Sequence, residues 1–269
     1  WQDAQICVLE EKDMDEIVQV CLASFVGNKD APGEDTFKWT FGPENREDPP
    51  DSCERFKKGM EFYMYWCARS TMWYGSVLGW RDQETGKLLG CCLTFHPGSI
   101  TYPGRPITNW RFLQMVLNMR RGPPDHEDEK TYGKWAKLRH KQMGQAMEDL
   151  HKSVPGKHWY VYVLAAQPDQ QGKGIGSKLL AAVKDMAKLE EDPLTPVYLE
   201  CSPGKQGYYE KQGFTSVKTK KLEDPNPEGE GPYEAHAMLC VPKLLPDATK
   251  PEPAAAQEGA AGLYPKVQK

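Results

Sequence analysis

The chain has 269 residues, of which 39% are hydrophobic, and a formal net charge of −4 at pH 7. This length suits one large domain, and slight acidity without a basic stripe disfavours a nucleic-acid partner. No apolar run approaches the length that crosses a bilayer, so we expect no membrane partner. The eight cysteines stand singly or as the pair Cys91–Cys92, which suits reduced thiols and a cytoplasmic location. No Cys/His spacing indicates a metal site.

The first part of the chain is predicted to form a strand, a helix, a loop, a second helix and a hairpin. Asp13 and Glu16 resemble a capping box, and apolar residues from Met14 to Phe25 recur at helical spacing behind them. Gly, Pro and charged residues dominate 27–51, which is typical of a surface loop. The expected ranges are strand 5–9, helix 14–25, loop 27–51, helix 52–69, and strands 74–80 and 88–95.

The second part alternates strands and helices after a helical insert at 100–157. Within the insert we expect helices at 110–119 and 134–150. The later expectations are strand 159–166, a helix from 175, strand 196–201, helix 204–212, and strands 214–219 and 235–241. These elements predict one domain over residues 1–243. The Pro/Ala/Glu-rich tail at 244–269 is predicted to be disordered.

A glycine-rich turn links the strand predicted at 159–166 to the following helix. Gly172, Gly174 and Gly176 leave backbone N–H groups uncovered where the positive end of the helix dipole also points. This arrangement indicates a phosphate or pyrophosphate site. A P-loop is excluded because no Gly-Lys-Ser/Thr triplet follows at the required distance, and the spacing differs from the dinucleotide fingerprint GxGxxG. A tight turn without a ligand is the alternative.

Two motifs resemble the GNAT superfamily of CoA-dependent N-acyltransferases. Gln171, Gly174 and Gly176 match its Gln-x-x-Gly-x-Gly pyrophosphate loop, and residues 208–214, YYEKQGF, resemble its Tyr-Glu-Lys/Arg-x-Gly-Phe signature. The strand 197–202, VYLECS, resembles a Leu-Glu-x-Ser strand of puromycin N-acetyltransferase-like members. The match covers residues 88–241 well, and earlier residues only in element order. The resemblance implies an α+β GNAT fold, with a mixed, mostly antiparallel sheet flanked by helices.

The resemblance also implies acetyl-CoA as co-substrate. Strand-like hydrogen bonds to residues 164–166 would hold the pantetheine arm, and neighbouring N–H groups can polarise the thioester carbonyl. Lys205 stands where many members carry an Asn that contacts CoA, and it is a candidate for a phosphate of CoA. The cofactor-binding candidates are Leu164, Ala165, Ala166, Gln171, Gly172, Lys173, Gly174, Ile175, Gly176, Ser177 and Lys205.

Two residues are candidates for the catalytic groups. Tyr209 matches the Tyr of the family signature, whose hydroxyl would donate to the departing thiolate; Tyr208 is the alternative if the helix is rotated. Glu200 lies mid-strand among apolar neighbours, where a carboxylate is costly, so a role as general base is one reason for its place. One alternative is that Glu200 has only a structural partner. Another is that His96 or His158 is the base.

The expected activity is direct acyl transfer from acetyl-CoA to a small-molecule primary amine in a ternary complex. A protein or peptide N-acetyltransferase and a catalytically silent acyl-CoA-binding module are the alternatives. The 27–51 loop, the insert and aromatics such as Tyr63, Trp66, Trp73 and Trp110 are expected to contact the acceptor. The sequence leaves the acceptor, the acyl length and the oligomeric state open.

Overall fold

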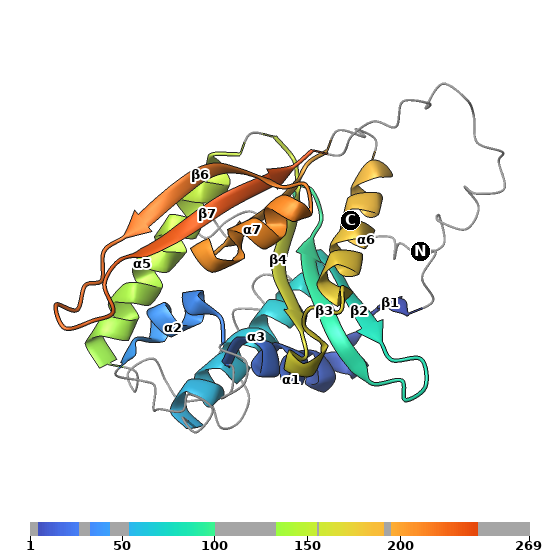
Figure 1. The fold of residues 1–269 in the computed structure, drawn as a ribbon, viewed down its shortest axis with the longest axis horizontal. Helices are drawn as coiled ribbons and strands as arrows, with labels where there is room; N and C mark the ends of the chain where they lie inside the picture. The colour runs from blue at the N-terminus through green and yellow to red at the C-terminus, as the bar shows by residue number, and fades with distance from the viewer. Residues whose placement is uncertain are drawn as a thin grey trace.

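A computed structural model describes residues 5–26, 33–43, 54–99, 133–154, 156–190 and 195–241. Its centre is a seven-stranded sheet in the order β1-β2-β3-β4-β5-β7-β6 (Figure 1). The β4–β5 pair is parallel and the other neighbouring pairs are antiparallel. The predicted α+β GNAT fold with a mixed, mostly antiparallel sheet is confirmed.

The first part of the chain builds one edge of the sheet and the helices on one face. A short strand leads through a 3₁₀ turn into the first helix, and a hairpin joins the next two strands. The elements are β1 (Ile6–Val8), η1 (Glu11–Asp13), α1 (Met14–Val26), α2 (Asp35–Phe41), α3 (Glu54–Tyr74), β2 (Gly75–Arg81) and β3 (Leu88–Phe95).

The second part builds the centre and the other edge of the sheet. Helix α5 comes first, and α6 connects the two parallel strands. The elements are α5 (Gly133–Lys152), β4 (Trp159–Ala166), η5 (Pro168–Gln170), α6 (Ile175–Lys188), β5 (Val197–Cys201), α7 (Pro203–Lys211), β6 (Thr215–Leu222) and β7 (Tyr233–Cys240).

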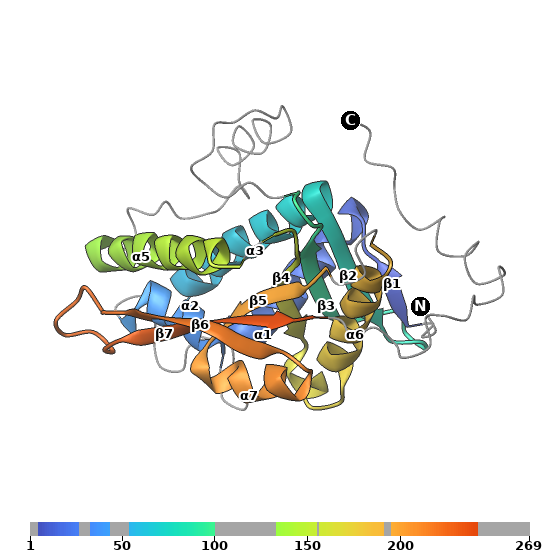
Figure 2. The same cartoon turned by 90° about the horizontal axis from the view of Figure 1, so that it is seen from above.

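Helices cover both faces of the sheet. Figure 2 shows α3 and α5 on one side and α6 and α7 on the other. Apolar side chains of α1 and α3 pack on one face of β2–β4, while those of α6 pack on the opposite face, around the buried Trp159 and Val161. Burial of these faces is the main stabilising contribution to the fold. None of the described helices is long and apolar enough to cross a membrane.

The structure corrects three expectations in the first part of the chain. The loop expected at 27–51 contains helix α2, whose Trp39 and Phe41 are buried. Helix α3 continues to Tyr74 instead of ending near 69. The capping box uses Glu10 and Asp13 rather than Asp13 and Glu16, because the Glu16 carboxylate binds Arg81. The helix expected at 110–119 and the tail at 244–269 lie outside the described residues.

The two parallel central strands separate partway along their length. Strand β4 pairs with β5 only from Trp159, opposite Val197, to Val161, opposite Leu199. On its other side β4 stays paired with β3 as far as Ala166. The second half of β4 therefore has one edge without a neighbouring strand, and the cavity described next opens at this edge.

Candidate functional site

One cavity of about 900 Å³ lies where β4 and β5 separate. Of the predicted cofactor-binding residues, every one except Lys173 lines it, and so do Tyr209 and Glu200. Lys173 is exposed, and its Nζ donates to Gln170 Oε1 at 3.2 Å. Residues predicted from three separate motifs thus meet around a single space that is large enough for two substrates.

The glycine-rich turn forms the start of helix α6. Gly174 is the N-cap residue with a φ of 87°, a conformation that favours glycine, and a Cβ there would meet no atom within 4 Å. At Gly176 a Cβ would lie 2.7 Å from the Tyr208 hydroxyl oxygen. This turn keeps the first N–H groups of α6 open to the cavity, as an anion site requires.

The unpaired edge of β4 supplies the other half of a cofactor cradle. Leu164, Ala165 and Ala166 line the cavity and, among the described residues, have no strand partner on the β5 side. Apart from the Ala166 carbonyl, which accepts a hydrogen bond from Gln171 Nε2 at 3.3 Å, their backbone groups on that side are available to an extended ligand, which would take the place of a neighbouring strand. The residues present therefore fit the pantetheine arm and the pyrophosphate of acetyl-CoA.

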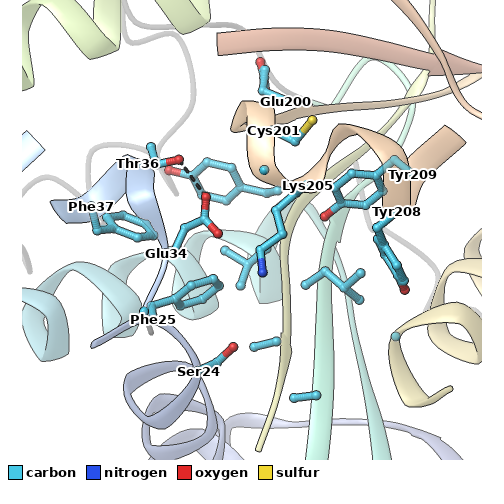
Figure 3. Close-up of a pocket in the computed structure, with 18 of the residues that line it drawn as sticks. Ser24, Phe25, Glu34, Thr36, Phe37, Glu200, Cys201, Lys205, Tyr208 and Tyr209 are labelled. Carbon is cyan, nitrogen blue, oxygen red and sulfur yellow. Dashed lines mark hydrogen bonds between the residues drawn. The ribbon is translucent and has the colours of Figure 1, made fainter. Parts of the chain in front are cut away.

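Helix α7 directs its two tyrosines to different places. The Tyr208 hydroxyl lies 3.4 Å from Ser177 Oγ, at the start of α6. The Tyr209 hydroxyl points into the cavity (Figure 3), and among the described residues no hydrogen-bond partner is found for it. Burial, with added effects of Cys201 and Glu34, raises the pKa of Tyr209 well above 10, so its proton stays on at neutral pH. Lys205, four residues earlier, extends into the same space.

Glu200 follows the last residue of β5 that pairs with β4. Its Oε1 accepts a hydrogen bond from the Tyr198 hydroxyl at 2.8 Å. Burial raises the pKa of Glu200 from 4.5 to about 7, although hydrogen bonds from Tyr160 and Tyr198 partly offset that effect. A carboxyl group with this pKa can exchange a proton at physiological pH, as a general base does.

Residues 146–225 match the model of a protein family described as an acetyltransferase (GNAT) domain. This segment of the chain therefore resembles a GNAT acetyltransferase domain. The matched segment includes β4, the glycine-rich turn, Glu200 and Tyr209. No curated protein matches the chain in sequence.

Solved structures are similar in fold to this chain at low sequence identity. Arylalkylamine N-acetyltransferase 2 from Aedes aegypti superposes with a TM-score of 0.54 at 13% identity, covering 88% of this chain and 98% of that chain. The histone acetyltransferase HPA2 and related acetyltransferase from Corynebacterium glutamicum gives 0.49 at 17% identity, covering 90% and 98%. Chaetomium thermophilum Naa20 gives 0.41 at 12% identity, covering 88% and 85%. The Aedes aegypti structure supports the fold, whereas the other two score too low to add to it.

Several other predicted residues do not line the cavity. His96 Nε2 lies 2.8 Å from Ser76 Oγ, and His158 Nε2 lies 3.0 Å from His151 Nε2, so both histidines make contacts elsewhere. Tyr63 lines the cavity, but Trp66 and Trp73 do not, and Trp110 lies outside the described residues. Within the described ranges, no three His, Cys, Asp or Glu side chains gather as a metal site would require.

The sequence prediction did not single out several residues that line the cavity. Helix α5 contributes His140, Met143 and Met147 to the wall. The segment around α2 and the start of β7 contribute Glu34, Thr36, Phe37 and Tyr233. The sequence analysis expected the 27–51 loop and the insert at 100–157, which contains α5, to contact the acceptor, but no motif singled out these residues.

Proposed function

We propose that this protein transfers an acetyl group from acetyl-CoA directly to a primary amine of a small molecule. The observation that carries the proposal is the single cavity, which extends from the glycine-rich turn past the free edge of β4 to Tyr209 and Glu200. Both substrates then fit in one space, so no covalent acyl-enzyme is needed. Bound acetyl-CoA supplies the activated acyl group as a thioester.

Residues of the chain account for each step of such a transfer. N–H groups of Gly172 and of Gly174 to Ser177 hold the pyrophosphate, since those of Gln171 and Lys173 already donate to backbone carbonyls. Lys205 contributes a positive charge to CoA binding. Glu200 first accepts a proton from the acceptor ammonium, and the neutral amine nitrogen then attacks the thioester carbon. The nitrogen loses its second proton as the amide forms, which balances the proton that the departing thiolate takes up. Tyr209 donates a hydrogen bond to the sulfur as the carbon–sulfur bond breaks, and its raised pKa keeps it in the donor form.

A small acceptor is favoured by the walls of the cavity. Helix α5 closes one side with Met143 and Met147, and the aromatic rings of Phe37 and Tyr63 line another. The Aedes aegypti structure with the same fold is named for an arylalkylamine acceptor, which agrees with an aromatic wall. The puromycin N-acetyltransferase-like subtype stays a prediction, since none of the comparisons above bears on it.

Thiol release from acetyl-CoA against a panel of amines and peptides tests the proposal. We expect release with a small amine, and a loss of about 100-fold or more in kcat for Tyr209→Phe with nearly unchanged CoA affinity. Release only with peptides would favour a protein acceptor. CoA binding without release for any acceptor would favour a silent acyl-CoA-binding module.

A further inference from the structure

Glu34 is a second carboxylate of the cavity, and its position is not explained by helix capping. It occupies the N-cap of α2, yet its side chain makes no hydrogen bond to the backbone of that helix. Instead Glu34 Oε1 accepts a hydrogen bond from Thr36 Oγ1 at 3.0 Å. In Figure 3 the carboxylate lies at the edge of the cavity, on the side of Phe25 and Phe37.

A hydrogen-bonded chain fixes the direction of this carboxylate. Thr36 Oγ1 lies 2.7 Å from the Tyr233 hydroxyl oxygen. A hydroxyl group has one proton, and that of Thr36 is donated to Glu34, so Tyr233 must donate to Thr36. Consecutive bonds of this kind polarise one another and hold Glu34 in one orientation. The chain joins α2 to β7, which are far apart in the sequence.

The charge of Glu34 acts on the reacting end of the cavity. It contributes to the raised pKa of Tyr209, and, after burial, it is the largest contribution to the raised pKa of Cys201, which reaches about 12. No ion pair to Glu34 is found among the described residues. Lys205 is the only Lys or Arg among the described residues that line the cavity, and no ion pair joins it to Glu34. A fixed negative charge in a confined space favours a cationic ligand.

We propose that Glu34 binds the ammonium group of the acceptor, so that the acceptor is an alkylamine that is cationic in solution. This inference rests on the acetyl transfer proposed above. An alkyl ammonium has a pKa of about 10.4 and is charged at neutral pH, whereas the nitrogen of an arylamine is neutral there. Glu34 therefore selects the acceptor and places its nitrogen near Tyr209, while Glu200 takes the proton.

The aromatic rings beside Glu34 indicate what kind of chemical group the acceptor carries next to its ammonium. The rings of Phe25 and Phe37 pack edge to face at 5.3 Å, and those of Phe37 and Tyr63 at 5.5 Å. The hydroxyl oxygens of Tyr63 and Tyr162 lie 3.1 Å apart and continue this wall to β4. Such a surface accepts an apolar or aromatic group and also attracts a cation above its ring faces. The acceptor class that fits is an alkylamine with an aromatic or apolar body.

The test compares 2-phenylethylamine with aniline and uses 2-phenylethanol as a neutral competitor. For the wild type we expect acetylation of 2-phenylethylamine well above aniline, and weak competition by the alcohol. Glu34→Gln should raise the KM for the amine about 10- to 100-fold, because a charge-assisted contact is lost. The kcat and the KM for acetyl-CoA should stay within about twofold. Thr36→Val, which removes the hydroxyl but keeps the carboxylate, should raise the amine KM by a smaller factor.

The matched control is Asp35→Asn, since Asp35 is the exposed neighbour of Glu34 and does not line the cavity. It should leave the KM for the amine unchanged.

The inference is overturned if Glu34→Gln leaves the KM for the amine unchanged. It is also overturned if this variant loses both kcat and the pH dependence of the rate, because Glu34 would then be the base. If the wild type acetylates no amine, the proposed function fails. Calorimetry in the presence of CoA then tests the role of Glu34 by comparing the affinities for 2-phenylethylamine and 2-phenylethanol. If the wild type prefers the amine to the alcohol and Glu34→Gln loses this preference, the inference is supported. Equal affinities of the wild type for the amine and the alcohol overturn it.

Discussion

At the scale of single residues, Glu200 has opposite effects on activity and on stability. As the base proposed above, Glu200 must be deprotonated, so kcat/KM should rise with pH through about 7 and then level off, because Tyr209 keeps its proton far above that range. Glu200→Gln should lower kcat by about 100-fold or more and remove this inflection. A pH–rate profile of the two proteins measures both effects. An inflection that persists in Glu200→Gln would assign the base to another group.

The effect of Glu200 on stability follows from the same rise in its pKa. Its folded pKa of about 7 exceeds the ordinary 4.5, so the folded chain holds the proton more tightly than the unfolded chain. The stabilising contribution of the protonated Glu200 carboxyl group is complete below about pH 4.5 and is lost as the pH rises through about 7. Above that pH the charged carboxylate lowers the free energy of unfolding by up to about 3 kcal/mol. Urea titrations at pH 5 and 8 should show this loss in the wild type and not in Glu200→Gln.

At the scale of elements, a buried ion pair fixes α5 over the acceptor side. Arg139 Nε lies 2.9 Å from Asp224 Oδ1, and the two side chains are only 0% and 4% exposed. Asp224→Asn removes the negative charge that faces the buried Arg139 guanidinium, so the free energy of unfolding should fall by about 3–5 kcal/mol. Because α5 carries Met143 and Met147, the KM for the amine should also rise more than that for acetyl-CoA.

The control for this pair is Asp149→Asn, since the Lys220–Asp149 pair also joins α5 to β6 but is 40% and 35% exposed. Its loss should cost far less than that of the buried pair, because water screens an exposed ion pair. Urea denaturation of both variants measures the difference. A loss for Asp224→Asn as small as that for Asp149→Asn would mean that apolar packing alone holds α5.

The glycine-rich turn gives a second prediction at this scale. Gly174→Ala has space for the new methyl group but must keep a φ of 87°, which costs about 1 kcal/mol. Gly176→Ala places the methyl group 2.7 Å from the Tyr208 hydroxyl oxygen and displaces that ring. Both should weaken CoA binding in calorimetry, and only Gly176→Ala should recover when Tyr208→Phe is added. Gly144→Ala in α5 meets no atom within 4 Å and should leave CoA affinity unchanged.

The sequence predicted elements whose signal is local and missed those that depend on distant contacts. Strand β4 was predicted with both ends correct because a continuous apolar run stops at Pro168. Helix α2 has only seven residues, and its place depends on Trp39, whose Nε1 donates to the carbonyl of Gly231 at 3.0 Å. Glu34 was missed for the same reason, since its partner chain ends at Tyr233. Glu200 was found because a carboxylate stands out in an apolar strand.

At the scale of the whole molecule, the separation of β4 and β5 predicts how acetyl-CoA changes the protein. Pairing between the strands ends at Val161 and Leu199, so the far half of β4 is held on one side only, by β3. A ligand that pairs with this free edge and bridges to α6 and α7 links the two parts of the sheet. At one hundred times its Kd it should stabilise the fold by about 2.7 kcal/mol, which corresponds to a rise in Tm of about 5–10 °C.

Hydrogen exchange locates this effect on the sheet. With acetyl-CoA bound, amides of Leu164 to Ala166 and of the turn at Gly174 to Ser177 should exchange more slowly, because their open N–H groups gain acceptors. Amides of Tyr160 and Val161 already lie between two paired strands and should change little, which makes them the internal control. Protection confined to the turn would mean that the ligand is held by its phosphates alone. In that case the free edge of β4 would have no part in placing the thioester near Tyr209.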